Sequence, residues 1–278
     1  MERITEIDQL KRKAEEIRYD IVDMIAEAGS GHPGGSLSAA DIGAVLFFNE
    51  MKYDPQNPEW KDRDKFILSK GHAAPLLYTL LAHAGYFERS ELKTLRKYKS
   101  RLQGHPASYM LPGVEVSTGS LGQGLSISCG IAMAGKMDKK NYRVYTLLGD
   151  GELDEGQVWE AAMFAAHKKL DNLCAIVDRN RLQIDGDTEK VMALEPLKAK
   201  WDAFGWHTIL IDGHNISDIL HAFEEFNTIR KKPTIILAKT VKGKGVSFME
   251  NIAGWHGKAP NKEELEQALK EIKARMHT

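Results

Sequence analysis

The sequence predicts an α/β fold in which a parallel sheet is covered by helices on both faces. From about residue 120 onward, short apolar runs rich in β-branched residues alternate with longer helical patterns. Such runs are typical of strands that are buried on both faces of a parallel sheet. No internal repeat, low-complexity segment or domain boundary is visible in the 278 residues. We therefore expect one domain over residues 1–278, long enough to bury a substantial core.

The first part of the chain predicts helices around one short strand. Apolar residues recur at helical spacing over 7–28, and Gly29 is a plausible end of that helix. The stretch SGHPGGS at 30–36 predicts a loop by its composition. Residues 99–120 are rich in proline and glycine and predict a long irregular loop, a kind of segment that is often functional. The other elements expected here are a helix over 37–51, a strand over 64–69, a helix over 73–84 and a small helix over 89–98.

The second part of the chain alternates regularly between the two kinds of element. Strands are expected over 143–148, 173–178, 207–211 and 234–238. Helices are expected over 122–137, 153–168, 194–204 and 215–230. The last predicted helix, over 261–276, is charged on most faces, which indicates a peripheral position.

Charge and composition exclude several classes of protein. The 38 Lys and Arg residues balance 39 Asp and Glu residues, so no basic surface for nucleic acid or membrane is indicated. No apolar run approaches the roughly 18 residues that a membrane span needs, and the charged N-terminus does not resemble a signal peptide. The two cysteines, Cys129 and Cys174, lie in apolar runs and are expected to be buried and reduced. We therefore expect a cytoplasmic protein that binds neither nucleic acid nor membrane.

The stretch LLGDGELDEG at 147–156 puts glycines and acidic side chains in a turn after a predicted strand. Ligands of α/β sheets collect at the carboxyl ends of the strands. Gly149 and Gly151 would allow a close approach of the backbone, and the next helix would point its free N–H groups at an anion. Asp150 would repel a phosphate there unless a divalent cation lay between the two. The turn therefore predicts a second oxygen ligand elsewhere.

A suitable ligand follows the next predicted strand. Asn180 lies just past the end of that strand, one strand–helix–strand step after Asp150. Taken alone, Asp150 could cap a helix and Asn180 could be a turn residue. Together, at one crossover spacing, they favour an all-oxygen site for Mg²⁺ or Ca²⁺.

Four of the ten histidines lie in loops rich in glycine or proline: His32 in SGHPGGS, His72 in SKGHAAP, His105 in QGHP and His256 in GWHGKAP. Binding residues concentrate on loops that a rigid scaffold holds in place. We therefore expect these four side chains to share one site. The other six are expected to be structural or exposed: His83, His167, His207, His214, His221 and His277.

Taken in order, these stretches resemble transketolase along nearly the whole chain. The GDG turn followed by Asn180 is similar to the thiamine diphosphate motif that many thiamine enzymes share. The stretches SGHPGGSLSAADI, LSKGHAAPLLYTLL, GHPASYMLPGVEVSTGSLGQG and KTVKGKGVSFMENIAGWHGKAP resemble transketolase in particular. The resemblance implies the diphosphate-domain fold of the thiamine enzymes.

The resemblance also implies a role for each matching position. The metal ligands would be Asp150, Asn180 and the carbonyl of Leu182, holding Mg²⁺ with Ca²⁺ or Mn²⁺ as substitutes. Glu155 would bridge to the partner half of the assembly. The residues implied to contact thiamine diphosphate are His72, Gly119, Ser120, Leu121, Gly151, Glu155, Asn180, Lys242 and His256. The implied catalytic residues are His32, His72, His105 and His256, since histidine donates and accepts protons near neutral pH.

The implied reaction is the transfer of a two-carbon ketol unit from a ketose phosphate to an aldose phosphate, as in the pentose phosphate pathway, through a carbanion of thiamine diphosphate. A full transketolase continues with a pyrimidine-binding domain, whose Glu activates the cofactor, and a C-terminal domain. No segment of the 278 residues resembles either. We therefore expect the N-terminal subunit of a split transketolase, completed by a C-terminal subunit that supplies this Glu in an α2β2 assembly.

Two alternatives remain open at this point. Another thiamine diphosphate transferase subunit, similar to deoxyxylulose-phosphate synthase or dihydroxyacetone synthase, would share the GDG turn and a stretch related to TVKGKG. A non-catalytic diphosphate-binding module would predict loss of the loop histidines, yet all four are present.

Overall fold

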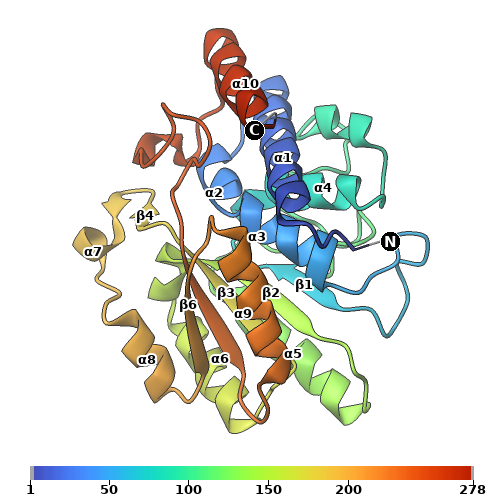
Figure 1. Cartoon of the computed structure of the whole chain (residues 1–278), viewed down its shortest axis with the longest axis vertical. Coiled ribbons are helices and arrows are strands. Elements are labelled where there is room, and N and C mark those ends of the chain that lie inside the picture. Colours follow the sequence, from blue (N-terminus) through green and yellow to red (C-terminus); the bar gives the residue numbers. More distant parts are fainter. Residues whose placement is uncertain (1–2, 277–278) are drawn as a thin grey trace.

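The computed structural model describes residues 3–276. Its centre is a five-stranded sheet in the order β1-β2-β3-β7-β6, with every neighbouring pair parallel, as the sequence predicts. Figure 1 shows these strands running together through the molecule with helices packed around them. The strands are β1 (Lys65–Leu68), β2 (Val144–Gly149), β3 (Leu173–Arg179), β6 (His207–Asp212) and β7 (Thr234–Lys239).

Each face of the sheet is covered by its own hydrophobic core, because successive side chains of a strand point to opposite faces. Tyr145 and Leu147 of β2 belong to one core, whereas Val144 and Leu148 belong to the other. The larger core involves α1 (Ile7–Ala28), α3 (Ala40–Val45), α4 (Ala74–His83) and α9 (Ile216–Thr228). The smaller core involves α5 (Gln123–Met137), α6 (Gly156–His167) and α8 (Leu197–Ala203).

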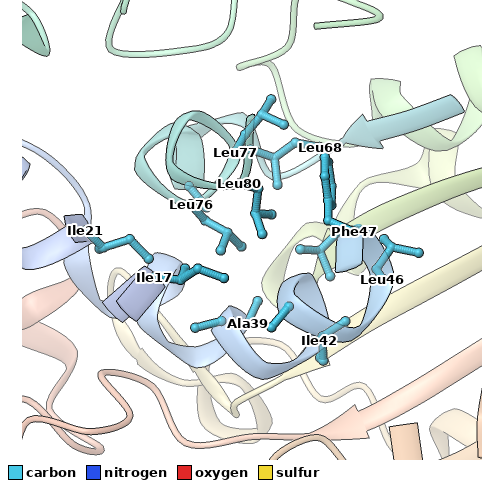
Figure 2. Packing of buried hydrophobic residues seen from close by; sticks show 14 of the residues in the cluster. Ile17, Ile21, Ala39, Ile42, Leu46, Phe47, Leu68, Leu76, Leu77 and Leu80 are labelled. Carbon is cyan, nitrogen blue, oxygen red and sulfur yellow. The ribbon is translucent and has the colours of Figure 1, made fainter. Parts of the chain in front are cut away.

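The larger core is built from aliphatic and aromatic side chains of several helices and of the strands. The first helix is amphipathic, and its buried stripe faces this core. It ends at Gly29, which adopts a left-handed conformation with φ 64° and donates its N–H to Ala26 O. Figure 2 shows the packing of Ile17, Ile21, Ala39, Ile42, Leu46, Phe47, Leu68, Leu76, Leu77 and Leu80.

Two of the sequence predictions in the first part of the chain are wrong. The expected loop at 30–36 contains a short buried helix, α2 (Pro33–Ser38), with Pro33 at its first turn. Small residues fit there because the helix is packed tightly: a Cβ added at Gly34 would lie 2.9 Å from Trp255 O. The expected helix over 37–51 is interrupted after α2, continues as α3, and ends in a π-helical turn, η1 (Leu46–Glu50).

Other elements are shorter than predicted or were missed. The small helix expected over 89–98 is a 3₁₀ helix, η3 (Arg89–Thr94), and residues 99–120 are irregular as predicted. The turn after β2 forms a 3₁₀ helix, η4 (Gly151–Asp154), before α6 begins. The elements that the sequence did not predict are η2 (Gly71–Ala73), a hairpin of β4 (Leu182–Gln183) and β5 (Gly186–Asp187), α7 (Thr188–Val191) and η5 (Ala253–His256).

The last helix, α10 (Lys262–Met276), lies beside α1 at the periphery, as predicted (Figure 1). It buries Ala268 and Ile272 against the larger core. Both cysteines are free and buried, and burial raises the pKa of the Cys129 thiol to about 12. Within residues 3–276, no helix is both long enough and apolar enough to cross a membrane.

Candidate active site

A cavity of about 320 Å³ lies at the carboxyl ends of β2 and β3, where the sequence predicts the ligand site. The parallel register pairs Gly149 with Asp178, so the residues that follow these two strands come together. Loops from the first part of the chain and from the segment after β7 complete the wall. The predicted site residues that line this cavity are His32, His72, His105, Gly119, Leu121, Asp150, Gly151, Asn180, Leu182, Lys242 and His256.

Asp150 is held at both of its carboxylate oxygens. Its Oδ2 accepts from the backbone N–H of Arg181 at 2.5 Å and from Arg179 Nη1 at 3.2 Å. Its Oδ1 accepts from the backbone N–H of Gly151 at 2.8 Å. Burial, together with the nearby charge of Asp178, raises the pKa of the Asp150 carboxyl. A divalent cation at this position would favour the ionised form. Donation by the Gly151 amide to a diphosphate stays a prediction.

Of the other two predicted metal ligands, Leu182 contacts a lysine. Asn180 Oδ1 accepts from the backbone N–H of Leu182 at 3.1 Å. The carbonyl oxygen of Leu182 accepts from Lys242 Nζ at 2.8 Å, so a cationic group already contacts one of these oxygens. Lys242 is 2% exposed, and burial lowers its pKa to about 8 although Asp150 and Asp178 act in the opposite direction.

The donor set fits a hard divalent cation, since it combines a carboxylate, an amide and a backbone carbonyl oxygen. In the part of the chain that the structure describes, no three His, Cys, Asp or Glu side chains form a potential metal-binding group. A metal here would therefore depend on the mixed oxygen set of Asp150, Asn180 and Leu182.

The four loop histidines share one site, as the sequence predicts. The ring centroid of His32 lies 5.4 Å from those of His72 and His256 and 6.2 Å from that of His105, and the His72 and His256 centroids are 5.1 Å apart. Burial, with Lys70 adding to it, lowers the pKa of His72 to about 2. Burial also lowers the pKa of His256 to about 3 and that of His32 to about 4. These imidazoles are therefore neutral near pH 7 and can each donate at one nitrogen and accept at the other.

Two predicted residues do not line the cavity. Ser120 is exposed, although its neighbours Gly119 and Leu121 face the cavity. Glu155 is exposed just before α6. Their roles stay predictions, and the exposure of Glu155 leaves its carboxylate accessible to another chain.

The histidines that we expected outside the site lie outside the cavity lining wherever they are described. His214 forms hydrogen bonds at both ring nitrogens. Its Nδ1 pairs with Asp41 Oδ2 at 2.8 Å, and its Nε2 accepts from the backbone N–H of Val241 at 2.8 Å. His277 lies outside the described residues.

Three buried charged residues, which the sequence did not point to, hold the site loops together. Glu152 accepts from the backbone N–H of Gly122 at 2.9 Å, from that of Gly149 at 3.0 Å and from the Ser69 hydroxyl. Lys70 and Asp178 form a buried ion pair at 2.5 Å. Glu152 and Lys70 stand inside the motifs named above, but side chains of these types are usually exposed and give no signal of burial.

Arg96 is a further cation that the sequence did not point to. It is exposed, and its charge contributes to lowering the pKa values of His32 and His105, after the larger effect of burial. Its guanidinium lies against Gly104, where an added Cβ would be 2.9 Å from Arg96 Cζ. This arginine therefore adds positive charge close to the histidine cluster.

Comparison with known proteins identifies the family. A family model described as transketolase, thiamine diphosphate binding domain, matches residues 9–275. The chain belongs to the transketolase family. It is 44% identical over 271 residues to one of the subunits of the apulose-4-phosphate transketolase of Phocaeicola vulgatus, covering 98% of this chain and 96% of that relative. It is 46% identical over 263 residues to the 6-deoxy-6-sulfo-D-fructose transketolase subunit SqwG of Clostridium sp. (strain MSTE9), with 95% and 96% covered.

Longer transketolases match this chain in one part of their length. Human transketolase is 46% identical over 267 residues, which are 96% of this chain and 42% of that protein. The crystal structure of transketolase from Campylobacter jejuni superposes with a TM-score of 0.90 at 36% identity, covering 95% of this chain and 43% of that one. The chain thus spans less than half the length of these transketolases and has the fold of their thiamine diphosphate-binding domain. It is a transketolase N-terminal chain of the thiamine diphosphate-binding type.

Proposed function

We propose that this chain is the cofactor- and metal-binding subunit of a two-chain ketol transferase that acts on sugar phosphates. The observation that carries the proposal is the meeting of Asp150, Asn180 and the Leu182 carbonyl with Lys242 and neutral histidines in one cavity. Two relatives of similar length that are named transketolase subunits support the two-chain form. Residues 1–278 would form one domain of that enzyme.

Thiamine diphosphate, when bound, supplies the carbanion and the electron sink for breaking and forming carbon–carbon bonds. Asp150, Asn180 and the Leu182 carbonyl would hold Mg²⁺, with Ca²⁺ or Mn²⁺ as substitutes. The proposed cofactor contacts are His72, Gly119, Ser120, Leu121, Gly151, Glu155, Asn180, Lys242 and His256. Among these, Lys242 and the two histidines would face the diphosphate as hydrogen-bond donors.

The histidine cluster would bind the sugar and move its protons. His32 Nδ1 is a buried ring nitrogen without a hydrogen-bond partner among the described residues, which leaves it free for a substrate hydroxyl. Because the pKa values of His32, His72 and His256 are lowered, each ring stays neutral near pH 7 and can offer a sugar hydroxyl one donor and one acceptor nitrogen. His105, nearer the surface, would meet the sugar first.

A partner chain would complete the site in an α2β2 assembly and supply the Glu that activates the cofactor. This part of the proposal is supported by the coverage of only 42% of human transketolase. It is also supported by the large apolar side chains of Met137, Met163 and Phe164, which are 70%, 61% and 41% exposed on α5 and α6. We further propose a cytoplasmic enzyme that serves sugar phosphate interconversion, as in the pentose phosphate pathway.

The test is ketol transfer by the purified chain with thiamine diphosphate and Mg²⁺, alone and mixed with a candidate C-terminal subunit. We expect activity only in the mixture, and we expect Asp150→Asn to abolish it. The donor panel should include apulose 4-phosphate and 6-deoxy-6-sulfofructose, because these sugars appear in the names of the two relatives. Full activity of the chain alone would contradict the two-chain proposal. Cofactor binding without any ketol transfer in the mixture would favour a non-catalytic module.

A further inference from the structure

We infer that two adjacent residues at the end of β3, Asp178 and Arg179, position the two side-chain metal ligands from opposite faces of the sheet. Asp178 would orient the amide of Asn180, and Arg179 would orient the carboxylate of Asp150. The inference rests on the metal site of the proposed function. It concerns positioning residues, which do not touch the metal or the substrate.

Successive residues of a strand point to opposite faces, and the contacts of these two residues follow that rule. Asp178 accepts from Ser38 Oγ at 2.5 Å and from Thr240 Oγ1, and it pairs with Lys70. Arg179 points the other way, toward Asp150 and the segment that contains α7. One strand end therefore reaches both ligands, because Asn180 follows it directly and Asp150 follows the neighbouring strand.

The carboxylate of Asp178 fixes the orientation of the Asn180 side-chain amide. The Asp178 side chain is fully buried, and its Oδ2 accepts from Asn180 Nδ2 at 3.0 Å. Its oxygens also accept from Lys70, Ser38 and Thr240, so both of them act as acceptors. A carboxylate only accepts hydrogen bonds, so it selects the NH₂ end of the amide. The Asn180 oxygen is thereby directed away from Asp178 and is available as a ligand.

Arg179 holds one oxygen of the Asp150 carboxylate. The arginine is 6% exposed, and its Nη1 donates to Asp150 Oδ2 at 3.2 Å and to Thr188 Oγ1 at 2.7 Å. Since Oδ2 also accepts the backbone N–H of Arg181, the oxygen left with one local partner is Oδ1. We expect Oδ1 to be the atom that binds the metal.

A cation beside a metal ligand would weaken metal binding if its charge were not balanced. Arg179 Nη2 donates to Glu189 Oε1 at 2.6 Å and to Glu195 Oε1 at 3.1 Å. These two carboxylates balance the guanidinium, so Arg179 can orient Asp150 without adding net positive charge. Groups that orient metal ligands in this way typically contribute about 10–100-fold to metal affinity.

The test measures binding of Mn²⁺ by electron paramagnetic resonance in the presence of thiamine diphosphate, on the full chain with its partner subunit if assembly is needed. The variants are Asp178→Asn, which keeps the shape and removes the charge, and Arg179→Gln. The matched controls are Arg179→Lys, which keeps one donor for Asp150, and Ser38→Ala, which removes a contact of Asp178 that does not involve Asn180. Circular dichroism checks that each variant is folded.

We expect the Mn²⁺ dissociation constant to rise about 10–100-fold in Asp178→Asn and in Arg179→Gln. The rise should be smaller in Arg179→Lys than in Arg179→Gln, and it should be less than about threefold in Ser38→Ala. Saturating Mn²⁺ should restore thiamine diphosphate binding, which a general loss of structure would not allow. A folded variant that binds Mn²⁺ within twofold of the wild type overturns the role of the residue it changes. If Asp178→Asn does not fold, the comparison of Arg179→Gln with Arg179→Lys tests the inference. Absence of Mn²⁺ binding by the wild type would instead overturn the proposed metal site itself.

Discussion

The ammonium of Lys242 donates to the carbonyl oxygen of Leu182 at 2.8 Å and lies 3.0 Å from His256 Nδ1. Leu182 O is also a proposed metal ligand, so lysine and metal would compete for one oxygen. A diphosphate would offer the ammonium a stronger acceptor than a neutral carbonyl. Cofactor binding would therefore release this oxygen to the metal.

Lys242→Met is expected to affect metal and cofactor in opposite directions. Without cofactor, Mn²⁺ should bind about tenfold more tightly, because a positive charge near its site is removed. Thiamine diphosphate should bind at least about tenfold more weakly, because a charge-assisted hydrogen bond is lost. Paramagnetic resonance and titration calorimetry give the two constants. Lys258→Met, at an exposed lysine paired with Glu264, is the control and should change neither. If Lys242→Met binds both Mn²⁺ and thiamine diphosphate more weakly, the expected competition between Lys242 and the metal is contradicted.

Stability should fall at mildly acidic pH because His32 is held neutral. Burial, with the charges of Arg96, His105 and Lys242, lowers the pKa of His32 to about 4, whereas a histidine in an unfolded chain titrates near about 6.5. Between these values the unfolded chain binds more protons than the folded chain, so the free energy of unfolding decreases as the pH falls below about 6.5. Above that pH this contribution is constant.

Urea unfolding of wild type and His32→Asn at pH 7.5, 6 and 5 tests this pH dependence. The wild type should lose more stability than the variant over that range. The difference should stay under about 1.4 kcal/mol per pH unit, because the ring is partly exposed. His221→Asn, at an exposed position of α9, is the control and should follow the wild type. Identical profiles for wild type and His32→Asn would contradict the assignment of His32 as a neutral group.

Alanine substitutions at two glycines of α5 should change the free energy of unfolding in opposite directions. A Cβ at Gly124 would lie 2.7 Å from the backbone Cα of Ser69, so Gly124→Ala should destabilise the chain by about 1–3 kcal/mol. Gly130 is exposed inside the helix with nothing within 4 Å, so Gly130→Ala should stabilise it by about 0.5–1 kcal/mol. Urea unfolding of the two variants measures both. A destabilising Gly130→Ala would indicate a contact that this structure does not contain.

The buried carboxylate of Asp41 should be costly to remove. It pairs with Arg18 and with His214, and it is 6% exposed. Asp41→Ala leaves Arg18 buried with one fewer acidic partner, which should destabilise the chain by about 3–5 kcal/mol. Thermal or urea unfolding gives the value. Asp8→Ala, which breaks an exposed pair with Lys11, is the matched control and should leave stability unchanged. Equal effects of the two substitutions would refute the buried ion pair.

Much of the fold could be predicted from the sequence because its strands are apolar and its helices periodic. The predicted strands overlap β1, β2, β3, β6 and β7, and the predicted first helix coincides with α1. Helix α2 was missed because glycine and serine suggest a loop, whereas their small size is what allows the close contact of Gly34 with Trp255. The hairpin of β4 and β5 was missed because strands of two residues have no periodicity to detect.

The candidate site was predictable where short motifs carry it. Asp150 and Asn180 come together because β2 and β3 are neighbours, which the spacing along the chain already indicates. The role of Lys70 was not predictable, since its partner Asp178 is far away in the sequence. Buried ion pairs of this kind depend on tertiary contacts, which local patterns do not contain.

The two buried cysteines are reporters of how this molecule opens. Cys174 lies in the larger core, and Cys129 lies in the smaller core on the opposite face of the sheet. Burial keeps both thiols protonated at neutral pH, because it raises their pKa values. A thiol reagent can therefore modify each cysteine only when its own layer of helices separates from the sheet. The labelling rates of the two native cysteines, measured in a single sample, would report how fast each layer opens without any engineered labelling site.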